Sequence, residues 1–281
     1  MFGNIKHYLR KILYKVPGVE TLWIQANKKR KHHEFSGWGM TSNSYTPWYM
    51  GGGDAISKDF LSAQQEIEKF AVEGRFKIDQ FEHVEDNANN LKALRGLMWR
   101  HYIVFWSVRY ASRATSGIKN LVECGVCNGM TAYFAMSALQ RANFKAFLYD
   151  AWEGMKEGNL SESEKGQVEK YAEISIADTK DNLRMFQNKT VFIKGIIPES
   201  LAYRDKPTEL IWLHIDLNSS APTLAVLNEF FDKMLPGGVV LFDDYAWRSY
   251  YDTKIAVDAF FANKKGILLP LPTGQAIFFK Q

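Results

Sequence analysis

The sequence predicts an α/β protein built on a mostly parallel sheet that is flanked by helices and ends in an antiparallel hairpin. From residue 119 onward, short apolar runs alternate with segments of helical periodicity. Such alternation is typical of parallel strands joined by crossover helices. The last two apolar runs, 266–272 and 275–281, are joined only by Thr273 and Gly274. Since a helix cannot fit there, these runs predict an antiparallel hairpin.

The composition is that of a globular protein with a substantial core. Of the 281 residues, 46% are hydrophobic and 23% are charged. The most apolar run, 102–108, is far shorter than a membrane span, and no apolar core of a secretory signal follows the N-terminus. With two cysteines, a disulfide framework is not expected, so a reducing cytoplasm is the expected location.

Positive charge is concentrated in residues 1–33, which hold eight lysines and arginines against Glu20 alone. This segment therefore has a net charge of +7. Because the whole chain has a net charge of +4, the remaining residues carry −3, which argues against a nucleic-acid channel among them. Apolar residues at helical spacing over 2–16 predict a basic amphipathic helix that Pro17 ends. Two interpretations stay open: peripheral contact with an anionic membrane, or packing on this domain or a neighbouring subunit.

The segment before the alternating region is expected to form an extension. Residues 37–54 are rich in glycine and aromatics without periodicity, which favours either a lid over a substrate or a structural wrap. Residues 56–115 are predicted to be helical, and the apolar helix over 96–114 is expected to be buried or to form a homo-oligomer interface. We therefore expect an N-terminal extension over 1–90 and a catalytic domain over 91–281.

The elements of the alternating region follow from its pattern. Strands are predicted over 119–124, 145–150, 190–195, 210–216, 237–244, 266–272 and 275–281. Helices are predicted over 131–140, 179–187, 223–235 and 250–263.

The stretch 121–131, LVECGVCNGMT, allows two interpretations. Its two cysteines, Cys124 and Cys127, have the spacing of a redox or zinc pair. A zinc site needs a second group of ligands, which the sequence lacks, so buried thiols beside a tight turn are favoured. Gly125 and Gly129 follow a strand and open a helix, which is typical of a cofactor loop: Gly125 permits the turn and Gly129 the close approach of a ligand.

With Glu123 before these glycines, the loop resembles the first motif of class I S-adenosylmethionine-dependent methyltransferases. Asp150 closes the next strand, where that family holds the ribose hydroxyls, and the terminal hairpin also matches the family's fold. The resemblance implies S-adenosylmethionine as cofactor. The other cofactor-binding residues that it implies are Val126 and Thr131 near the loop, Trp152 after Asp150, and Gly195 and Ile196 after the third strand. For Trp152, Gly195 and Ile196, a purely structural role stays open.

Carboxylates follow two further strands. Asp216 closes 210–216, and Asp243 and Asp244 close 237–244. If these strands are neighbours, the three side chains meet at the edge where open α/β sheets bind ligands. Their mutual repulsion favours a divalent cation such as magnesium or calcium, although each aspartate could instead cap a helix or turn.

Residues 213–247, LHIDLNSS to DDYAW, resemble the macrocin O-methyltransferase family of magnesium-dependent enzymes that methylate sugar hydroxyls. The resemblance implies that Asp216, Asp243 and Asp244 bind Mg²⁺. Relatives commonly have a second aspartate where this chain has Asn218, which cannot act as a base, so Asp216 or an outer residue is expected to accept the proton. His214 shares a strand face with Asp216 and could participate or be an ordinary core histidine.

The resulting expectation is a magnesium-dependent O-methyltransferase for a sugar, a glycosylated metabolite or a surface glycan. Nucleic-acid N-methylation is disfavoured because HIDLN stands where an Asp-Pro-Pro-Tyr motif would be. Two alternatives stay open. A nucleotide-sugar glycosyltransferase would also use metal-bound aspartates, and a silent binding module would bind the cofactor without turnover.

Overall fold

The computed structural model describes most of residues 91–281 and parts of the N-terminal segment. The described residues are 36–37, 40–41, 57–74, 91, 94–154, 174–246 and 250–281. The predicted basic helix, the basic run 28–33 and most of 37–54 lie outside them. Within 36–41, two short strands, β1 (Ser36–Gly37) and β2 (Met40–Thr41), pair antiparallel.

A seven-stranded sheet organises the chain and confirms the predicted fold class. Its order is β5-β4-β3-β6-β7-β9-β8, and the pairs are parallel except those that β9 makes with β7 and β8. The terminal hairpin therefore inserts its last strand beside β7. The strands are β3 (Lys119–Cys124), β4 (Phe144–Asp150), β5 (Thr190–Lys194), β6 (Leu210–Ile215), β7 (Met234–Phe242), β8 (Gly266–Pro270) and β9 (Ala276–Lys280).

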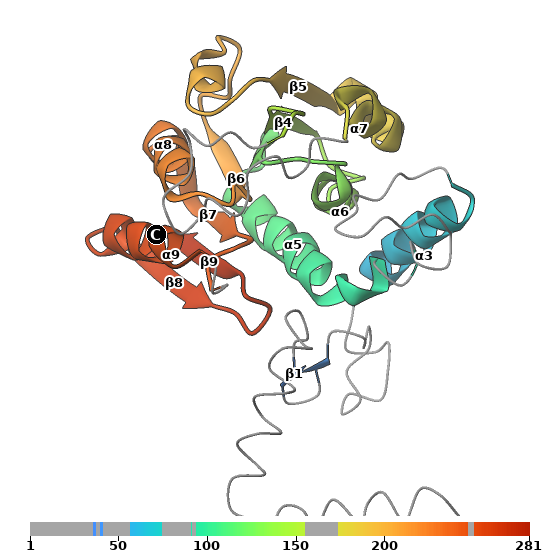
Figure 1. Cartoon of the computed structure of the whole chain (residues 1–281), viewed down its shortest axis with the longest axis horizontal. Helices are drawn as coiled ribbons and strands as arrows, with labels where there is room; N and C mark the ends of the chain where they lie inside the picture. Colours follow the sequence, from blue (N-terminus) through green and yellow to red (C-terminus); the bar gives the residue numbers. More distant parts are fainter. Residues whose placement is uncertain are drawn as a thin grey trace, which may run out of the picture.

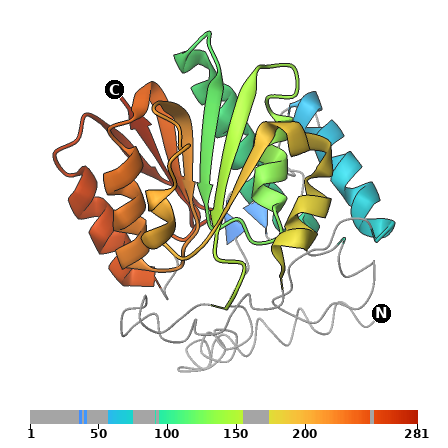
Figure 2. The ribbon, with the colours of Figure 1, turned by 90° about the horizontal axis from the view of Figure 1, so that it is seen from above.

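The helices lie on both faces of this sheet (Figures 1 and 2). The α-helices are α3 (Lys58–Val72), α5 (Met98–Ala111), α6 (Met130–Ser137), α7 (Ile176–Asn182), α8 (Ser220–Phe230) and α9 (Tyr251–Phe261). The 3-10 helices are η3 (Ser112–Ala114), η6 (Arg184–Lys189) and η7 (Glu199–Ala202). None of the helices in the described part of the chain is long and apolar enough to cross a bilayer.

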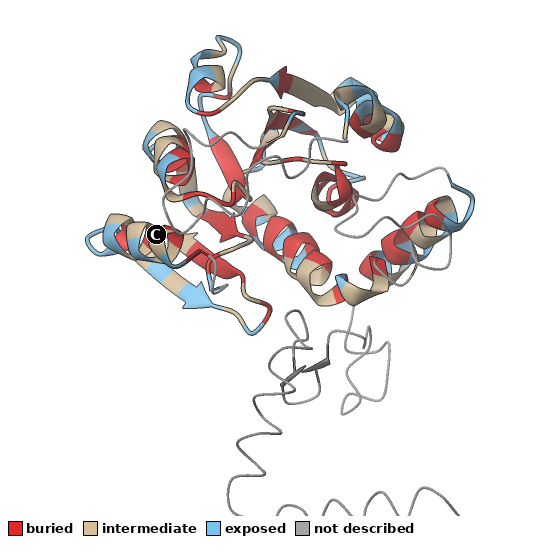
Figure 3. Cartoon of the chain, in the orientation of Figure 1, coloured by how far each residue is buried: buried red, intermediate tan, exposed pale blue. Residues whose placement is uncertain are grey.

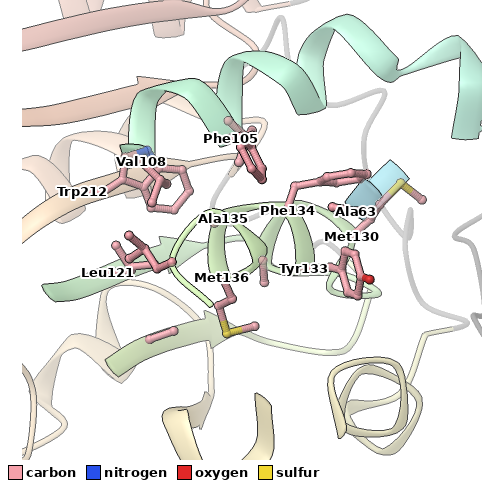
Figure 4. Close-up of a cluster of buried hydrophobic side chains, with 14 of the residues drawn as sticks. Ala63, Phe105, Val108, Leu121, Met130, Tyr133, Phe134, Ala135, Met136 and Trp212 are labelled. Carbon is pink, nitrogen blue, oxygen red and sulfur yellow. The ribbon is translucent and has the colours of Figure 1, made fainter. Parts of the chain in front are cut away.

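Two hydrophobic clusters fill the space between the sheet and the helices. One joins α3, α5 and α6 to one face of the sheet, and Figure 4 shows Ala63, Phe105 and Phe134 of these helices within it. The other joins α8 and α9 to the opposite face. The alternation of side chains along each strand produces this division: on β3, Leu121 belongs to the first cluster and Val122 to the second. The result is a helix–sheet–helix sandwich.

Helix α5 is the buried helix that the sequence predicts. Its buried residues include Val104, Phe105 and Val108, and its contacts are with α6, β6 and β7 (Figure 3). Only part of the surface of α5 is open, where Trp106 and Tyr110 are 40% and 37% exposed. Helix α3 shares the same core, so the expected division of the chain at residue 90 stays a prediction.

The strand ends differ from the prediction in a way that matters for the site. Strands β6 and β7 end at Ile215 and Phe242, whereas the sequence pattern includes the following aspartates in the strands. The carboxylates therefore lie in the turns just beyond the strand tips.

Candidate active site

Backbone hydrogen bonds join the tips of five neighbouring strands and bring most of the predicted site residues to one edge of the sheet. Each residue that follows a strand donates its N–H to the carbonyl oxygen at the end of an adjacent strand. The pairs are Gly195 to Asp150 at 2.9 Å, Gly125 to Tyr149 at 2.9 Å, Asp216 to Cys124 at 2.9 Å and Asp243 to Ile215 at 3.1 Å. The glycine loop thus lies between Asp150 and the aspartates of β6 and β7.

Both glycines of the loop have left-handed backbones, with φ of 89° at Gly125 and 87° at Gly129. A Cβ at Gly125 would lie 1.8 Å from the carbonyl oxygen of Asp216, so the glycine permits the close approach of β3 and β6. A Cβ at Gly129 would lie 2.9 Å from Leu183, so its absence leaves room for a protein side chain. Ligand approach, which the sequence suggested for Gly129, is not needed to explain this glycine.

The carboxylate of Asp150 accepts three backbone hydrogen bonds. Its Oδ2 accepts from the N–H of Val126 at 2.7 Å and of Cys127 at 2.8 Å, and its Oδ1 accepts from the N–H of Trp152 at 2.6 Å. Both oxygens of the carboxylate are therefore engaged by the backbone of the loop and of the turn after β4. Asp150 therefore holds the glycine loop in place, a role that the sequence did not indicate.

Trp152 completes the support of this loop. Its backbone is left-handed, its side chain is buried, and its indole N–H donates to the carbonyl of Cys127 at 3.1 Å and to Oγ1 of Thr179 at 2.8 Å. The Thr179 hydroxyl donates to the same carbonyl at 2.6 Å. Trp152 is thus part of the core, and a cofactor contact by this residue stays a prediction.

The cysteines fit the structural interpretation of CGVC. Both are free, and burial raises the pKa of the Cys124 thiol well above its ordinary value. Raising this pKa disfavours the thiolate that redox and zinc chemistry require. Among the described residues, the group that could hold a metal consists of the three aspartates and includes neither cysteine.

The remaining predicted cofactor residues lie at the same edge. Thr131 is in the first turn of α6 and is half-buried. Gly195 and Ile196 follow β5, and the carbonyl of Ile196 accepts from the N–H of Ser200 at 2.8 Å, which forms a turn into η7. A cofactor contact by any of the three stays a prediction.

Glu123 and His214 lie beneath the edge, on adjacent strands and on the face covered by α5. Both are almost fully buried, and the Oε1 of Glu123 is 3.5 Å from Nδ1 of His214. Within the described residues, neither carboxylate oxygen of Glu123 has a hydrogen-bond partner. Burial, with the charge of Asp150, raises the pKa of Glu123 well above its ordinary value, and burial lowers that of His214 to about 3. Burial therefore disfavours the charged form of both side chains, and His214 is neutral at pH 7.

His214 lies on the buried side of the acidic residues. Its ring stacks on Trp212, and its Nε2 is 3.9 Å from Oδ1 of Asp243. Because His214 has no exposed surface, direct contact with an acceptor would require the ring to move. Its participation in catalysis stays a prediction.

The three predicted metal ligands come together. Oxygen atoms of Asp216, Asp243 and Asp244 lie within 4.8 Å of one another. Burial, followed by the charge of Asp244 and a hydrogen bond shared with it, raises the pKa of Asp216 well above its ordinary value. Such a cluster of hard oxygen donors suits a divalent cation.

Arg100 and Gln275 contact this cluster, and the sequence analysis missed both. Arg100, from α5, forms an ion pair with the carboxylate of Asp243, and its Nη2 is 3.1 Å from the carbonyl oxygen of Asp243 and 3.9 Å from Oδ1 of Asp244. The amide of Gln275 donates to Oδ1 of Asp243 at 2.8 Å. An available signal was the arginine within an otherwise apolar helix.

Asn218 is held by Tyr250, a third residue that the sequence analysis missed. Its backbone is left-handed, with φ of 53°, and its Oδ1 accepts a hydrogen bond from the hydroxyl of Tyr250. Both side chains are largely buried. The amide oxygen of Asn218 is therefore already engaged by the protein.

Comparisons with known proteins agree with this geometry. The sequence profile of the Macrocin-O-methyltransferase (TylF) family matches residues 112–280. Among solved structures, the O-methyltransferase NovP is similar at 16% identity with a TM-score of 0.61, over 80% of this chain and 100% of NovP. The calicheamicin methyltransferase CalS11 is similar at 18% identity with a TM-score of 0.53, over 81% of this chain and 97% of CalS11. These two similarities show the fold. No curated protein sequence matches the chain significantly.

Proposed function

The chain belongs to the macrocin O-methyltransferase (TylF) family, and from this premise we propose that it transfers a methyl group from S-adenosylmethionine to a sugar hydroxyl with the help of magnesium. The observation that carries the proposal is the junction of the two predicted sites. The backbone N–H of Asp216 donates a hydrogen bond to the carbonyl oxygen of Cys124 at 2.9 Å. Cys124 directly precedes the glycine loop. The acidic cluster and the cofactor loop are therefore neighbours.

The residues of the glycine loop fit the cofactor. Asp150 lies at the tip of β4 against the glycine loop, where its carboxylate would face a ribose hydroxyl. The buried Glu123, with both oxygens unpartnered in the described residues, adds acceptor capacity beneath the loop. Gly195 and Ile196 would lie on the adenine side. S-adenosylmethionine held there would supply a methyl group bonded to a positively charged sulfur.

The acidic cluster fits magnesium. Three carboxylates face one guanidinium, which leaves a formal charge of −2 among groups that are largely shielded from water. Asp216, Asp243 and Asp244 would hold the cation. A bound magnesium ion would supply a Lewis acid that lowers the pKa of an acceptor hydroxyl.

Asp216 is the best candidate for the general base. Asn218 cannot accept a proton, and its carbonyl already accepts from Tyr250. Asp216 has a carboxylate, which can accept a proton, in the same cluster. S-adenosylmethionine would supply the methyl group to the acceptor oxygen with breakage of its carbon–sulfur bond, and Asp216 would accept the hydroxyl proton.

A sugar is the proposed acceptor because the family is defined by macrocin O-methylation. Glycosylated metabolites and surface glycans both present such hydroxyls.

The proposal is tested by cofactor binding and turnover together. S-adenosylhomocysteine is titrated calorimetrically into the wild type, Asp216→Asn and Asp181→Asn, with and without magnesium. Methyl transfer to a panel of glycosides is measured in parallel. Asp181 is an exposed aspartate on α7 and serves as a matched control. We expect Asp216→Asn to bind the cofactor product but to lose at least about 100-fold in turnover, within the range that general-base catalysis supplies.

Two outcomes would overturn the proposal. Folded wild type that binds a nucleotide sugar but no S-adenosylhomocysteine would be a glycosyltransferase. Binding without methyl transfer to any glycoside would leave the silent binding module, which Asn218 makes a specific alternative.

A further inference from the structure

We propose that Arg100 is the resident counterion of the acidic cluster and that its positive charge lowers the affinity of the cluster for a divalent cation. The inference rests on the proposed function, because it concerns the same cation site. It assigns a role to a residue that lies 143 positions away from Asp243 in the sequence.

The position of Arg100 supports this role. Its side chain is 13% exposed and meets Asp243 at both the carboxylate and the carbonyl oxygen. A guanidinium so shielded from water needs an anionic partner, because an unpaired buried charge is costly. Arg100 is therefore held in the cluster by the same carboxylates that a cation would use.

The three aspartates are not equivalent as ligands. Asp243 is engaged by Arg100 at one carboxylate oxygen and by Gln275 at the other. Asp216 and Asp244 share a hydrogen bond with each other, and Asp244 is farther from Arg100, with 3.9 Å between its Oδ1 and Nη2. Full use of Asp243 by a cation therefore requires Arg100 to give way.

Charge determines the size of the effect. With all three aspartates ionised, the cluster carries −2 when Arg100 is present and −3 when it is absent. At about 4 Å and an effective dielectric constant of about 20, one unit charge changes the binding of a cation by much more than tenfold. Because the side chain of Arg100 can also swing away, we expect a smaller change of about tenfold.

The test is calorimetric titration of magnesium into metal-free protein without cofactor. Four proteins form a cycle: wild type, Arg100→Met, Asp243→Asn and the double variant. Arg109→Met is the matched control, because Arg109 lies on the same helix but pairs with the exposed Asp59 at 2.8 Å. Thermal melting confirms that each protein is folded.

We expect Arg100→Met to bind magnesium about tenfold more tightly than wild type and Asp243→Asn about tenfold more weakly. The double variant, which restores the formal charge of −2, should bind within about threefold of wild type, and Arg109→Met within about twofold. If Arg100→Met does not fold, the comparison between Asp243→Asn and the double variant measures the same effect, since removal of Arg100 should again tighten binding about tenfold.

Failure of the inference and of the cation site are distinguishable. Magnesium binding that is weakened in Asp243→Asn but is equal to wild type or weaker in Arg100→Met would overturn the inference alone and leave the proposed cation site intact. No magnesium binding by any folded variant would overturn both.

Discussion

Glu123 and His214 lie side by side on the parallel strands β3 and β6, with 3.5 Å between Oε1 of the glutamate and Nδ1 of the histidine. Burial disfavours the charged form of both groups, since it raises the pKa of the acid and lowers that of the base. Both pKa values in the folded protein therefore differ from those in the unfolded chain. The first consequence is a pH dependence of stability.

Glu123→Gln should become more stable relative to wild type as pH rises. The raised pKa means that folded Glu123 keeps its proton while the unfolded chain loses it above about pH 4.5, so wild type loses stability with rising pH. The expected gain of the variant is up to about 1.4 kcal/mol per pH unit until the folded pKa is reached. Urea denaturation at pH 5, 6, 7 and 8 measures it, with the surface variant Glu209→Gln as control. A difference that stays constant with pH would contradict the prediction.

Alanine substitutions at the two glycines of the loop should lower the stability of the protein for different reasons. Gly125→Ala should cost more than about 3 kcal/mol, since its Cβ would lie 1.8 Å from a backbone oxygen that cannot move aside. Gly129→Ala meets the flexible Leu183 and should be partly relieved by a second change, Leu183→Ala.

The control for both is Gly74→Ala. Gly74 also has a positive φ, 66°, but nothing lies within 4 Å of its Cβ position. The stability that Gly74→Ala loses should therefore reflect backbone strain alone, about 1 kcal/mol. Equal losses at Gly74 and Gly125, measured by chemical denaturation, would show that the contact with Asp216 is unimportant.

The sheet and the strand-tip residues were predictable because local pattern determines them. Apolar runs separated by helical segments specify parallel strands, and the two-residue link between the last runs requires a hairpin. Residues that close or directly follow such strands, Asp150 and Asp216 among them, must then meet at one edge. For these positions, the place of a residue along the chain determines its place in the fold.

The partners of these residues were not predictable in the same way. Arg100 and Gln275 reach Asp243 from a helix and a hairpin that are remote in sequence. Strand alternation also indicates that His214 shares a face with Asp216, but it cannot show that α5 covers that face. Contacts of this kind depend on how helices pack, which periodicity alone does not specify.

His101→Phe should lose less stability than wild type as the pH falls. His101 is buried and stacks on Phe134, and burial, with the charge of Arg100, lowers its pKa from 6.5 to about 3. The unfolded chain binds a proton below pH 6.5 and the folded chain does not, so stability falls as pH falls from about 6.5 toward 3. At pH 5 this proton uptake lowers the unfolding free energy of wild type by about 2 kcal/mol. The difference in unfolding free energy between variant and wild type should therefore be about 2 kcal/mol more favourable to the variant at pH 5 than at pH 7.5. Denaturation curves at the two pH values measure the change, and an unchanged difference would contradict it.

Asp150 should prove to be both a stability residue and a cofactor residue. Its carboxylate holds the N–H groups of Val126, Cys127 and Trp152, so Asp150→Ala leaves three donors without their acceptor. Since hydrogen bonds to a charged group contribute about 1.5–3 kcal/mol each, the ligand-free variant should lose about 3 kcal/mol or more of unfolding free energy. Asp150→Asn keeps an accepting oxygen and should lose less.

Asp178→Ala provides the comparison for this prediction. Asp178 also binds backbone N–H through its carboxylate, but in the capping box of the exposed start of α7, so its loss should cost only about 1 kcal/mol. Calorimetry with S-adenosylhomocysteine on the same three variants then separates the two roles of Asp150. If Asp150 only held ribose, Asp150→Ala would lose affinity while its ligand-free stability matched wild type. We expect both to fall, because the loop that Asp150 orders is the loop that the cofactor would contact.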